Sequence, residues 1–227
     1  MFLKFIQPSI EVLSIRIDEP ITTMTDLIMA AICFYAYFRI KQQEPSGRIK
    51  GYFKYYFLTL GMATLAGGLL GHAFLYSLSP IWKLVSWIFT LLSVAILSHA
   101  LIELSKPLLK PGFSKMVSRI NFLILSLALL YTLYTLAFSA VKYYTIFGMF
   151  IVVGSLSYVI YQKTEMRGVL KLITGVSVGL LSAIIFSFEW GLGPWLNHND
   201  ISHLILSFSA ISVYQGAILI IESPSLV

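Results

Sequence analysis

Apolar stretches of about twenty residues, separated by short polar segments, run through almost the whole chain. Seven of them lie at residues 22–40, 55–77, 81–103, 119–139, 143–161, 169–189 and 201–221. A helix of this length rises 1.5 Å per residue and therefore crosses the roughly 30 Å of hydrocarbon in a bilayer. The pattern predicts an all-α membrane protein, a seven-transmembrane helix bundle over residues 21–222, with an N-terminal segment (1–20) and a short C-terminal tail (223–227).

The composition also indicates a multi-pass integral membrane protein. Hydrophobic residues make up 58% of the 227 residues, charged residues make up 11%, and the mean hydropathy is +0.84. A soluble domain has about 25% charged residues. The net charge of +6 comes from Lys and Arg in short connections, where they meet anionic headgroups. We therefore expect membrane lipids as partners and no nucleic acid. The single cysteine, Cys33, excludes an intrachain disulfide.

The distribution of basic residues predicts the orientation of the bundle. The loops after the first, third and fifth stretches hold twelve Lys and Arg residues. The N-terminal segment and the other loops hold four, including Lys4 and Arg16. Basic residues concentrate on the cytoplasmic side of membrane proteins. The N-terminus is therefore expected outside and the C-terminus inside.

The N-terminal segment differs from the seven apolar stretches. Pro8, Glu11 and Asp18 interrupt it, which fits neither the apolar region of a signal peptide nor a membrane span. We expect this segment to lie at the membrane interface.

Polar residues near the ends of the apolar stretches fall into two layers. In the predicted orientation, an outer layer contains Asp26, His72, Glu189, His198, Asp200 and His203. Ionisable groups are costly in hydrocarbon, so each of them is a candidate functional residue. The inner boundary holds His99 and Glu103, whose i, i+4 spacing places them on one helix face, as a relay or as two interfacial residues in contact.

Some of the outer residues also have a capping interpretation. Thr23 and Asp26 match a capping box at the start of the first helix, which would account for Asp26 without any function. In the segment NHNDISH, from Asn197 to His203, an Asn or Asp200 is expected to cap the last helix. Capping does not account for His198 or His203.

The second stretch carries Gly61, Gly68 and Gly71 on the same side as His72. Small residues on a helix face allow a neighbouring backbone to approach closely, so this face is expected to point into the bundle. His72, His198 and His203 then reach one depth from two helices. Three imidazoles with an open position for water are typical of a catalytic zinc site, and they make zinc the expected cofactor.

This arrangement resembles the superfamily that includes alkaline ceramidases and the progestin and adipoQ receptors, often abbreviated CREST. The resemblance rests on seven helices, on His72 in GHAFLY late in the second, and on His198 and His203 in NHNDISH at the start of the seventh. It implies a zinc site formed by these three histidines. The ceramidases of that superfamily hydrolyse an amide bond in a lipid, which implies a possible lipid substrate.

The sequence departs from the superfamily pattern at three places. The two histidines of the last helix are separated by four residues instead of three, Gly68 replaces a serine, and WKLVSWIF lacks an acidic residue. Hydrolysis of a lipid ester or amide would then need Asp200 or Asp26 as the catalytic base, with Glu189 as a further candidate, and zinc to lower the pKa of its bound water.

Other functional classes are open at this stage. A noncatalytic seven-helix receptor or scaffold with a structural polar cluster is the main alternative, because the superfamily includes receptors and the assisting residues are missing. A transporter would be expected to show repeated halves with broken helices, which are not evident. A retinal protein is excluded because the last helix contains no lysine for a Schiff base.

Overall fold

The computed structural model describes residues 7–44 and 46–223. The positions of Lys4, of most of the predicted C-terminal tail and of the first residues of the N-terminal segment lie outside this part of the chain. Within it, seven helices are long and apolar enough to cross a membrane. The all-α bundle predicted from the sequence is thereby confirmed, and the membrane orientation stays a prediction.

The spans begin and end close to the predicted boundaries. They consist of α1 (Pro20–Lys41), α2 (Arg48–Ala66) with the π-helix η1 (Gly67–Ala73), α3 (Lys83–Ser105), α4 (Phe113–Thr135), a continuous span of α5 (Ser139–Ile146), the π-helix η5 (Phe147–Gly154) and α6 (Ser155–Thr164), then α7 (Arg167–Ser187) and α8 (His198–Ile221). Short 3₁₀ turns η2 (Leu75–Ser77), η3 (Pro80–Trp82) and η4 (Lys106–Leu108) flank α3.

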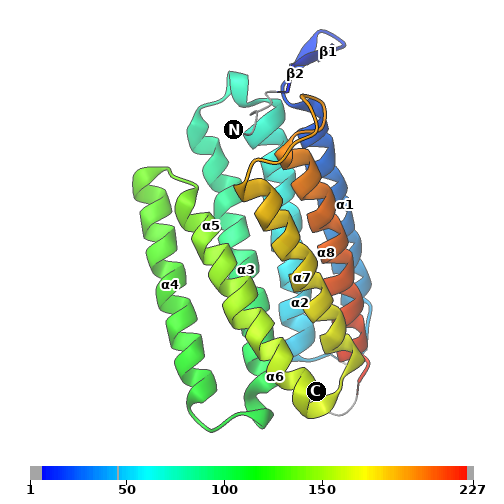
Figure 1. Ribbon diagram of the computed structural model, residues 1–227, viewed down its shortest axis with the longest axis vertical. Coiled ribbons are helices and arrows are strands. Elements are labelled where there is room, and N and C mark those ends of the chain that lie inside the picture. The colour runs from blue at the N-terminus through cyan, green and yellow to red at the C-terminus, as the bar shows by residue number, and fades with distance from the viewer. Residues whose placement is uncertain (1–6, 45, 224–227) are drawn as a thin grey trace.

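One end of the bundle carries the start of α1, the end of η1 and the start of α8, and we call it the N-terminal end (Figure 1). The last helix, α8, ends at the opposite end. A hairpin of β1 (Ile10–Val12) and β2 (Ile15–Ile17) precedes α1 and extends beyond the N-terminal end. This hairpin was not predicted, because three-residue strands with few turn residues carry little signal in a sequence.

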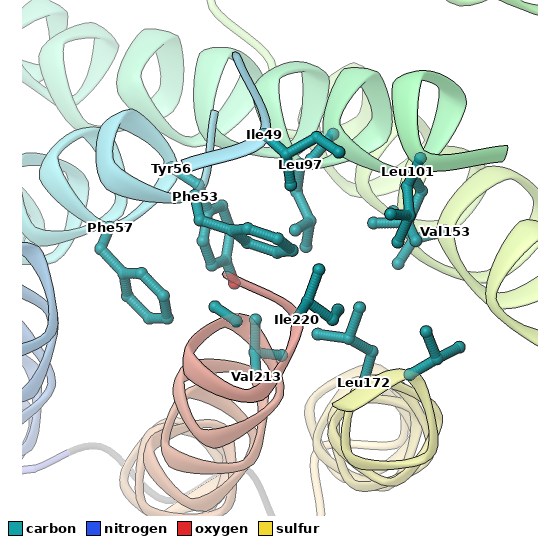
Figure 2. Close-up of a cluster of buried hydrophobic side chains, with 14 of the residues drawn as sticks. Ile49, Phe53, Tyr56, Phe57, Leu97, Leu101, Val153, Leu172, Val213 and Ile220 are labelled. Atoms are coloured by element: carbon teal, nitrogen blue, oxygen red, sulfur yellow. The ribbon is translucent and has the colours of Figure 1, made fainter. Parts of the chain in front are cut away.

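The core lies where α2, α3, α7, α8 and η5 meet. Figure 2 shows aromatic side chains of α2, including Phe53 and Tyr56, directed toward Leu97 of α3 and Val213 and Ile220 of α8. These side chains are buried, and Phe53 and Leu97 are fully so. In a bilayer the hydrocarbon is as apolar as the core, so close van der Waals packing supplies the stabilisation.

Glycines bring α7 and α8 into direct backbone contact. A Cβ at Gly168 would lie 2.8 Å from the carbonyl oxygen of Gly216, and one at Gly216 would lie 2.6 Å from the carbonyl oxygen of Gly168. A further contact joins the Ser209 hydroxyl to the carbonyl of Gly175 at 2.7 Å. Small residues permit such close crossings in membranes. The position of α8, and therefore of His203, is tied to α7 along its length.

Candidate functional site

Four ionisable side chains from three segments converge at the N-terminal end of the bundle. They are Glu19, immediately before α1, Asp26 in α1, His72 in η1 and His203 in α8. We call this set the histidine–carboxylate cluster. Three of these residues belong to the polar layer predicted from the sequence, and Glu19 was not predicted.

The π-helical segment η1 carries His72 into the cluster. Residues 67–73 continue α2 without a break but with the wider π-helical turn. Such segments are frequent at functional sites, because the altered winding turns a side chain away from its regular helical direction. Two glycines of the segment also admit Asp26, since a Cβ at Gly68 would lie 2.9 Å from the Asp26 Cβ. The predicted close approach at the glycine face is confirmed.

The Asp26 carboxylate lies between the two imidazoles. Its Oδ1 is 3.4 Å from Nδ1 of His203, and its Oδ2 is 3.9 Å from Nε2 of His72. The two rings are 6.3 Å apart in an edge arrangement. Asp26 is buried, whereas both histidines are half-buried. A buried carboxylate needs such partners, because an unpaired charge is strongly disfavoured in a low-dielectric environment.

Glu19 orients His72 from the other side of its ring. Oε2 of Glu19 is 2.6 Å from Nδ1 of His72, and this hydrogen bond lowers the pKa of the Glu19 carboxyl below its ordinary value. The ionised carboxylate accepts the Nδ1–H, so the Nε2 atom of His72 faces Asp26. A carboxylate on the far nitrogen of an imidazole fixes the tautomer and the orientation of the ring.

A neutral His72 and the Asp26 carboxylate need a proton-donating group or a cation between them. With Nδ1–H donated to Glu19, a neutral His72 presents an Nε2 lone pair to the Asp26 oxygen. Two acceptors facing each other repel unless a proton, a water molecule or a cation lies between them. A single water oxygen about 2.8 Å from each atom spans 3.9 Å. This pair can therefore bind and polarise a water molecule.

The hydroxyl of Thr25 helps to orient His203. It donates to the carbonyl of Thr22 at 2.9 Å and lies 3.3 Å from Nδ1 of His203. Because that hydroxyl hydrogen is already directed at Thr22, the histidine nitrogen acts as the donor. His203 is thereby expected to carry its proton on Nδ1, which faces both Thr25 and Asp26.

The capping interpretation of Asp26 is wrong. The first helix begins at Pro20, and its N-cap is Glu19, whose side chain forms no cap hydrogen bond. Asp26 therefore lies in the second turn, too far along the helix to bond to the free amides of the first. The Thr23 hydroxyl is instead directed at the carbonyls of Asp18 and Gly68, each at 3.4 Å.

The expected cap of α8 is formed by Asn197, whose side chain accepts from the backbone amides of Asn199 and Asp200, while Asp200 has a structural role beside it. Asp200 makes a capping box with Asn197, whose backbone amide donates to Oδ2 at 2.7 Å. The same carboxylate accepts from the Thr22 hydroxyl at 2.6 Å and from the Gln7 amide at 3.1 Å. Its oxygens are therefore engaged away from the imidazoles, and this geometry does not support the prediction of Asp200 as a catalytic base.

Gln7 completes this second network and was not predicted from the sequence. Its buried side chain accepts from the backbone amides of Ile21 and Thr22 at 2.8 and 3.2 Å, while its amide group also donates to the Pro194 carbonyl. The unpaired amides at the start of α1 are thus capped by a residue far outside the helix. Only the folded chain reveals such a long-range cap.

His198 lies at the margin of the cluster. It is the first residue of α8, and its buried ring packs 5.8 Å from that of Phe186 in α7. It interacts electrostatically with Glu19 and with His203. Among the residues described by the structure, no three His, Cys, Asp or Glu side chains are arranged to hold a metal ion. The zinc set of His72, His198 and His203 does not fit this geometry, and zinc stays a prediction.

Ser86 of α3 is a further neighbour of Asp26 that the sequence did not indicate. A Cβ at Gly67 would lie 3.2 Å from the Ser86 hydroxyl and 3.4 Å from Oδ2 of Asp26. Both oxygens therefore approach the same face of η1. The segment WKLVSWIF, which lacks an acidic residue, places this hydroxyl beside a carboxylate that comes from α1.

The remaining polar candidates do not join the cluster. Glu189 lies in the loop after α7, with a positive φ of 53°, instead of ending the helix as predicted. At the opposite end, His99 bonds to the Ala95 carbonyl and the Ser118 hydroxyl, while Glu103 pairs with Lys106 and Arg48. The expected contact between His99 and Glu103 is thus replaced by separate partners.

Comparison with known proteins assigns the chain to a protein family. Residues 21–222 match the model of a family of unknown function, DUF6962. The chain belongs to this family. No curated protein and no solved structure matches it. The matched range contains every helix of the bundle, and within it Asp26, His72 and His203.

Proposed function

We propose that the histidine–carboxylate cluster is a hydrolytic acid–base centre that acts on an ester or amide bond of a membrane lipid. The observation that carries this proposal is the buried Asp26 carboxylate between two imidazoles, one of which is oriented by Glu19. A base with a second group that orients it is the recurring arrangement of proton-transfer sites. The cluster lies at the end of apolar helices, which is the depth of the linkage between a lipid headgroup and its acyl chains.

In this proposal His72 and Asp26 activate a water molecule held between Nε2 and Oδ2. The water oxygen attacks the lipid carbonyl as its proton passes to His72, and the resulting imidazolium is stabilised by the Glu19 carboxylate. His72 then returns the proton to the departing alcohol or amine as the carbon–oxygen or carbon–nitrogen bond breaks. General acid–base catalysis of this kind contributes about 10²–10⁴ in rate.

Whether the protein binds zinc is separate from the acid–base reaction proposed for His72 and Asp26. Two imidazoles and a carboxylate are the donor types of one class of catalytic zinc site, but His72, His203 and Asp26 are not arranged to hold an ion in this structure. Holding an ion would require these three groups to move closer together. The proposed reaction steps involve only protein side chains, water and the lipid. Elemental analysis of the purified protein tests the point, and about one zinc per chain would favour the metal-assisted form of the reaction.

The proposed activity can be tested by incubating the purified protein with a total membrane lipid extract and identifying released fatty acids by mass spectrometry. His72→Gln and Asp26→Asn should each reduce release about 100-fold or more, because the first removes the proton-transfer group and the second removes the carboxylate that holds and polarises the water. His99→Gln is the matched control at the opposite end of the bundle and should retain activity. Equal release by the wild type and both cluster variants would refute the proposal.

A noncatalytic receptor or scaffold is the alternative, and one observation favours it. The ionisable groups of the cluster are paired mainly with one another, so the cluster also ties η1, α1 and α8 together. In that case the same variants would lower the thermal stability of the protein without any lipid turnover in the wild type. Measuring unfolding alongside lipid release separates the two functions.

A further inference from the structure

The hairpin before α1 has one aliphatic face and one charged face. Its register pairs Ile10 with Ile17 and Val12 with Ile15, whereas Glu11 lies opposite Arg16. Successive side chains of a strand point to opposite sides, so the two aliphatic pairs share one face. Leu13 forms the tip with Ser14, both with positive φ, in a two-residue turn that matches the twist of the strands.

Side chains at the tip and on the adjoining part of the aliphatic face of the hairpin are about half exposed or more. Leu13 is 93% exposed, Ile15 53% and Val12 46%. On the other face, Arg16 binds Asp18 through two hydrogen bonds of 2.7 and 3.2 Å and lies over the ring of Tyr76. Exposed aliphatic clusters of this kind mark a contact with another apolar phase or partner.

The surroundings of the hairpin indicate that the apolar phase in contact with its aliphatic face is the lipid bilayer. The hairpin leaves the bundle directly above α1, at the level where the membrane-spanning helices end (Figure 1). The first turns of α1 expose Met24, Leu27 and Ile28, which are lipid-facing positions in a spanning helix. Apolar side chains are therefore exposed both on the first turns of α1 and on the hairpin that precedes it, and the charged groups of the hairpin strands are confined to one paired face.

We propose that the hairpin lies on the surface of the bilayer, with Val12, Leu13 and Ile15 inserted at the boundary between headgroups and acyl chains. It is the β counterpart of an interfacial amphipathic helix, which inserts an apolar face and keeps its charged face in water. This proposal is independent of the hydrolytic activity proposed above.

Membrane contact of the hairpin sets the depth of the histidine–carboxylate cluster. The chain passes from β2 to Asp18, whose backbone amide donates to the carbonyl of Ala73 at 3.0 Å, and then to Glu19. Glu19 in turn bonds to His72. Only Asp18 separates β2 from the residue whose carboxylate orients His72, so the hairpin anchors this end of the site to the lipid surface.

The test uses single cysteines labelled with the environment-sensitive dye NBD in a Cys33→Ala background. The labelled protein is reconstituted into vesicles of phosphatidylcholine and phosphatidylglycerol. Val12→Cys and Ile15→Cys should give blue-shifted emission that lipids spin-labelled near the carbonyl quench strongly. Glu11→Cys, on the opposite face of the same strand, is the matched control and should be quenched several-fold less. Retention of the wild-type melting temperature establishes that each variant is folded.

Two results would overturn the proposal. Water-like emission at Val12 and Ile15, with the same weak quenching as at Glu11, would show that the hairpin stands clear of the bilayer. A blue shift that is insensitive to spin-labelled lipid and grows with the density of protein in the vesicle would show that the hairpin contacts a second protein chain instead.

Discussion

The position of Asp26 depends on the two glycines that face it. Gly68 lies against the Asp26 Cβ and the Thr23 carbonyl, and Gly67 lies against the Asp26 carboxylate and Ser86. A side chain at Gly68 would force Asp26 to move, because its Cβ would lie 2.9 Å from the Asp26 Cβ. Gly71, one turn further, is buried but has open space where a Cβ would stand. Neighbouring glycines of one segment therefore differ in how much they constrain the site.

These differences predict opposite effects of two similar substitutions. Gly68→Ala should destabilise the protein by about 1–3 kcal/mol, because the added methyl group would overlap Asp26. Gly71→Ala should be neutral or stabilise by up to about 1 kcal/mol, because alanine restricts the unfolded chain more than glycine. Thermal unfolding in detergent compares the two variants. Equal destabilisation by both would contradict the packing described at Gly68.

The hydrogen bond between Glu19 and His72 predicts a pH effect. The pKa of Glu19 is lowered in the folded protein, so the folded state binds this proton less readily than the unfolded state does. The stabilisation is therefore present above the ordinary Glu pKa and is lost as pH falls through the lower folded-state value. The melting temperature of Glu19→Gln should fall less than that of the wild type over this acidic range. Identical pH profiles would show that the bond does not contribute.

At the scale of elements, the N-terminal end is held together by a polar network separate from the histidine–carboxylate cluster. Asp200 completes the capping box of α8 and at the same time binds Thr22 of α1 and Gln7 of the N-terminal segment. The cap therefore joins three parts of the chain. Gln7 contributes the reciprocal cap of α1, so each helix start depends on a residue from elsewhere.

The network makes Asp200 a structural residue whose loss should be costly. Asp200→Ala removes the capping box and leaves the Thr22 hydroxyl and Gln7 amide without their acceptor. A lost cap costs about 1 kcal/mol and each unsatisfied buried donor about 1–3 kcal/mol, so a loss above about 2 kcal/mol is expected. Asn199→Ala, one position earlier, is the control and should change stability by less than about 0.5 kcal/mol. Chemical denaturation in mixed micelles provides the measurement.

At the scale of the whole molecule, the two ends of the bundle have different polar chemistry. The N-terminal end holds the histidine–carboxylate cluster and the hairpin, whereas the opposite end has the connections that follow α1, α3 and α6. These three connections and the helix ends beside them carry most of the basic residues. The asymmetry favours insertion with the cluster on the outer side of the membrane, because basic loops are retained on the cytoplasmic side.

The orientation can be determined by labelling cysteines in intact cells. Glu11→Cys, on the exposed charged face of the hairpin, should react with a membrane-impermeant maleimide, whereas Ser46→Cys, in the connection between α1 and α2, should react only after permeabilisation. The native Cys33 is fully buried and serves as an unreactive background. Reaction of Ser46→Cys in intact cells would mean that the bundle is inserted the other way round.

The number, type and approximate limits of the membrane helices follow from the sequence alone. A single apolar stretch that spans the hydrocarbon folds as a helix, because every backbone amide must be hydrogen-bonded within the segment. The same reasoning places polar residues at a depth, which is why Asp26, His72 and His203 were expected in one layer. The glycine face of the second span likewise indicated that His72 points inward.

Only the tertiary structure decided which residues of that layer meet. Depth along a helix does not specify the neighbour across it, because neighbours depend on helix rotation and on which helices pack together. The sequence therefore could not decide whether Asp26 contacts the imidazoles or caps a helix. It also could not show that Asp200 bonds to Thr22 and Gln7 as well as completing a capping box. Glu19 and Ser86 join the site through the π-helical turn of η1 and the close approach at Gly67, and those features exist only once the helices have packed.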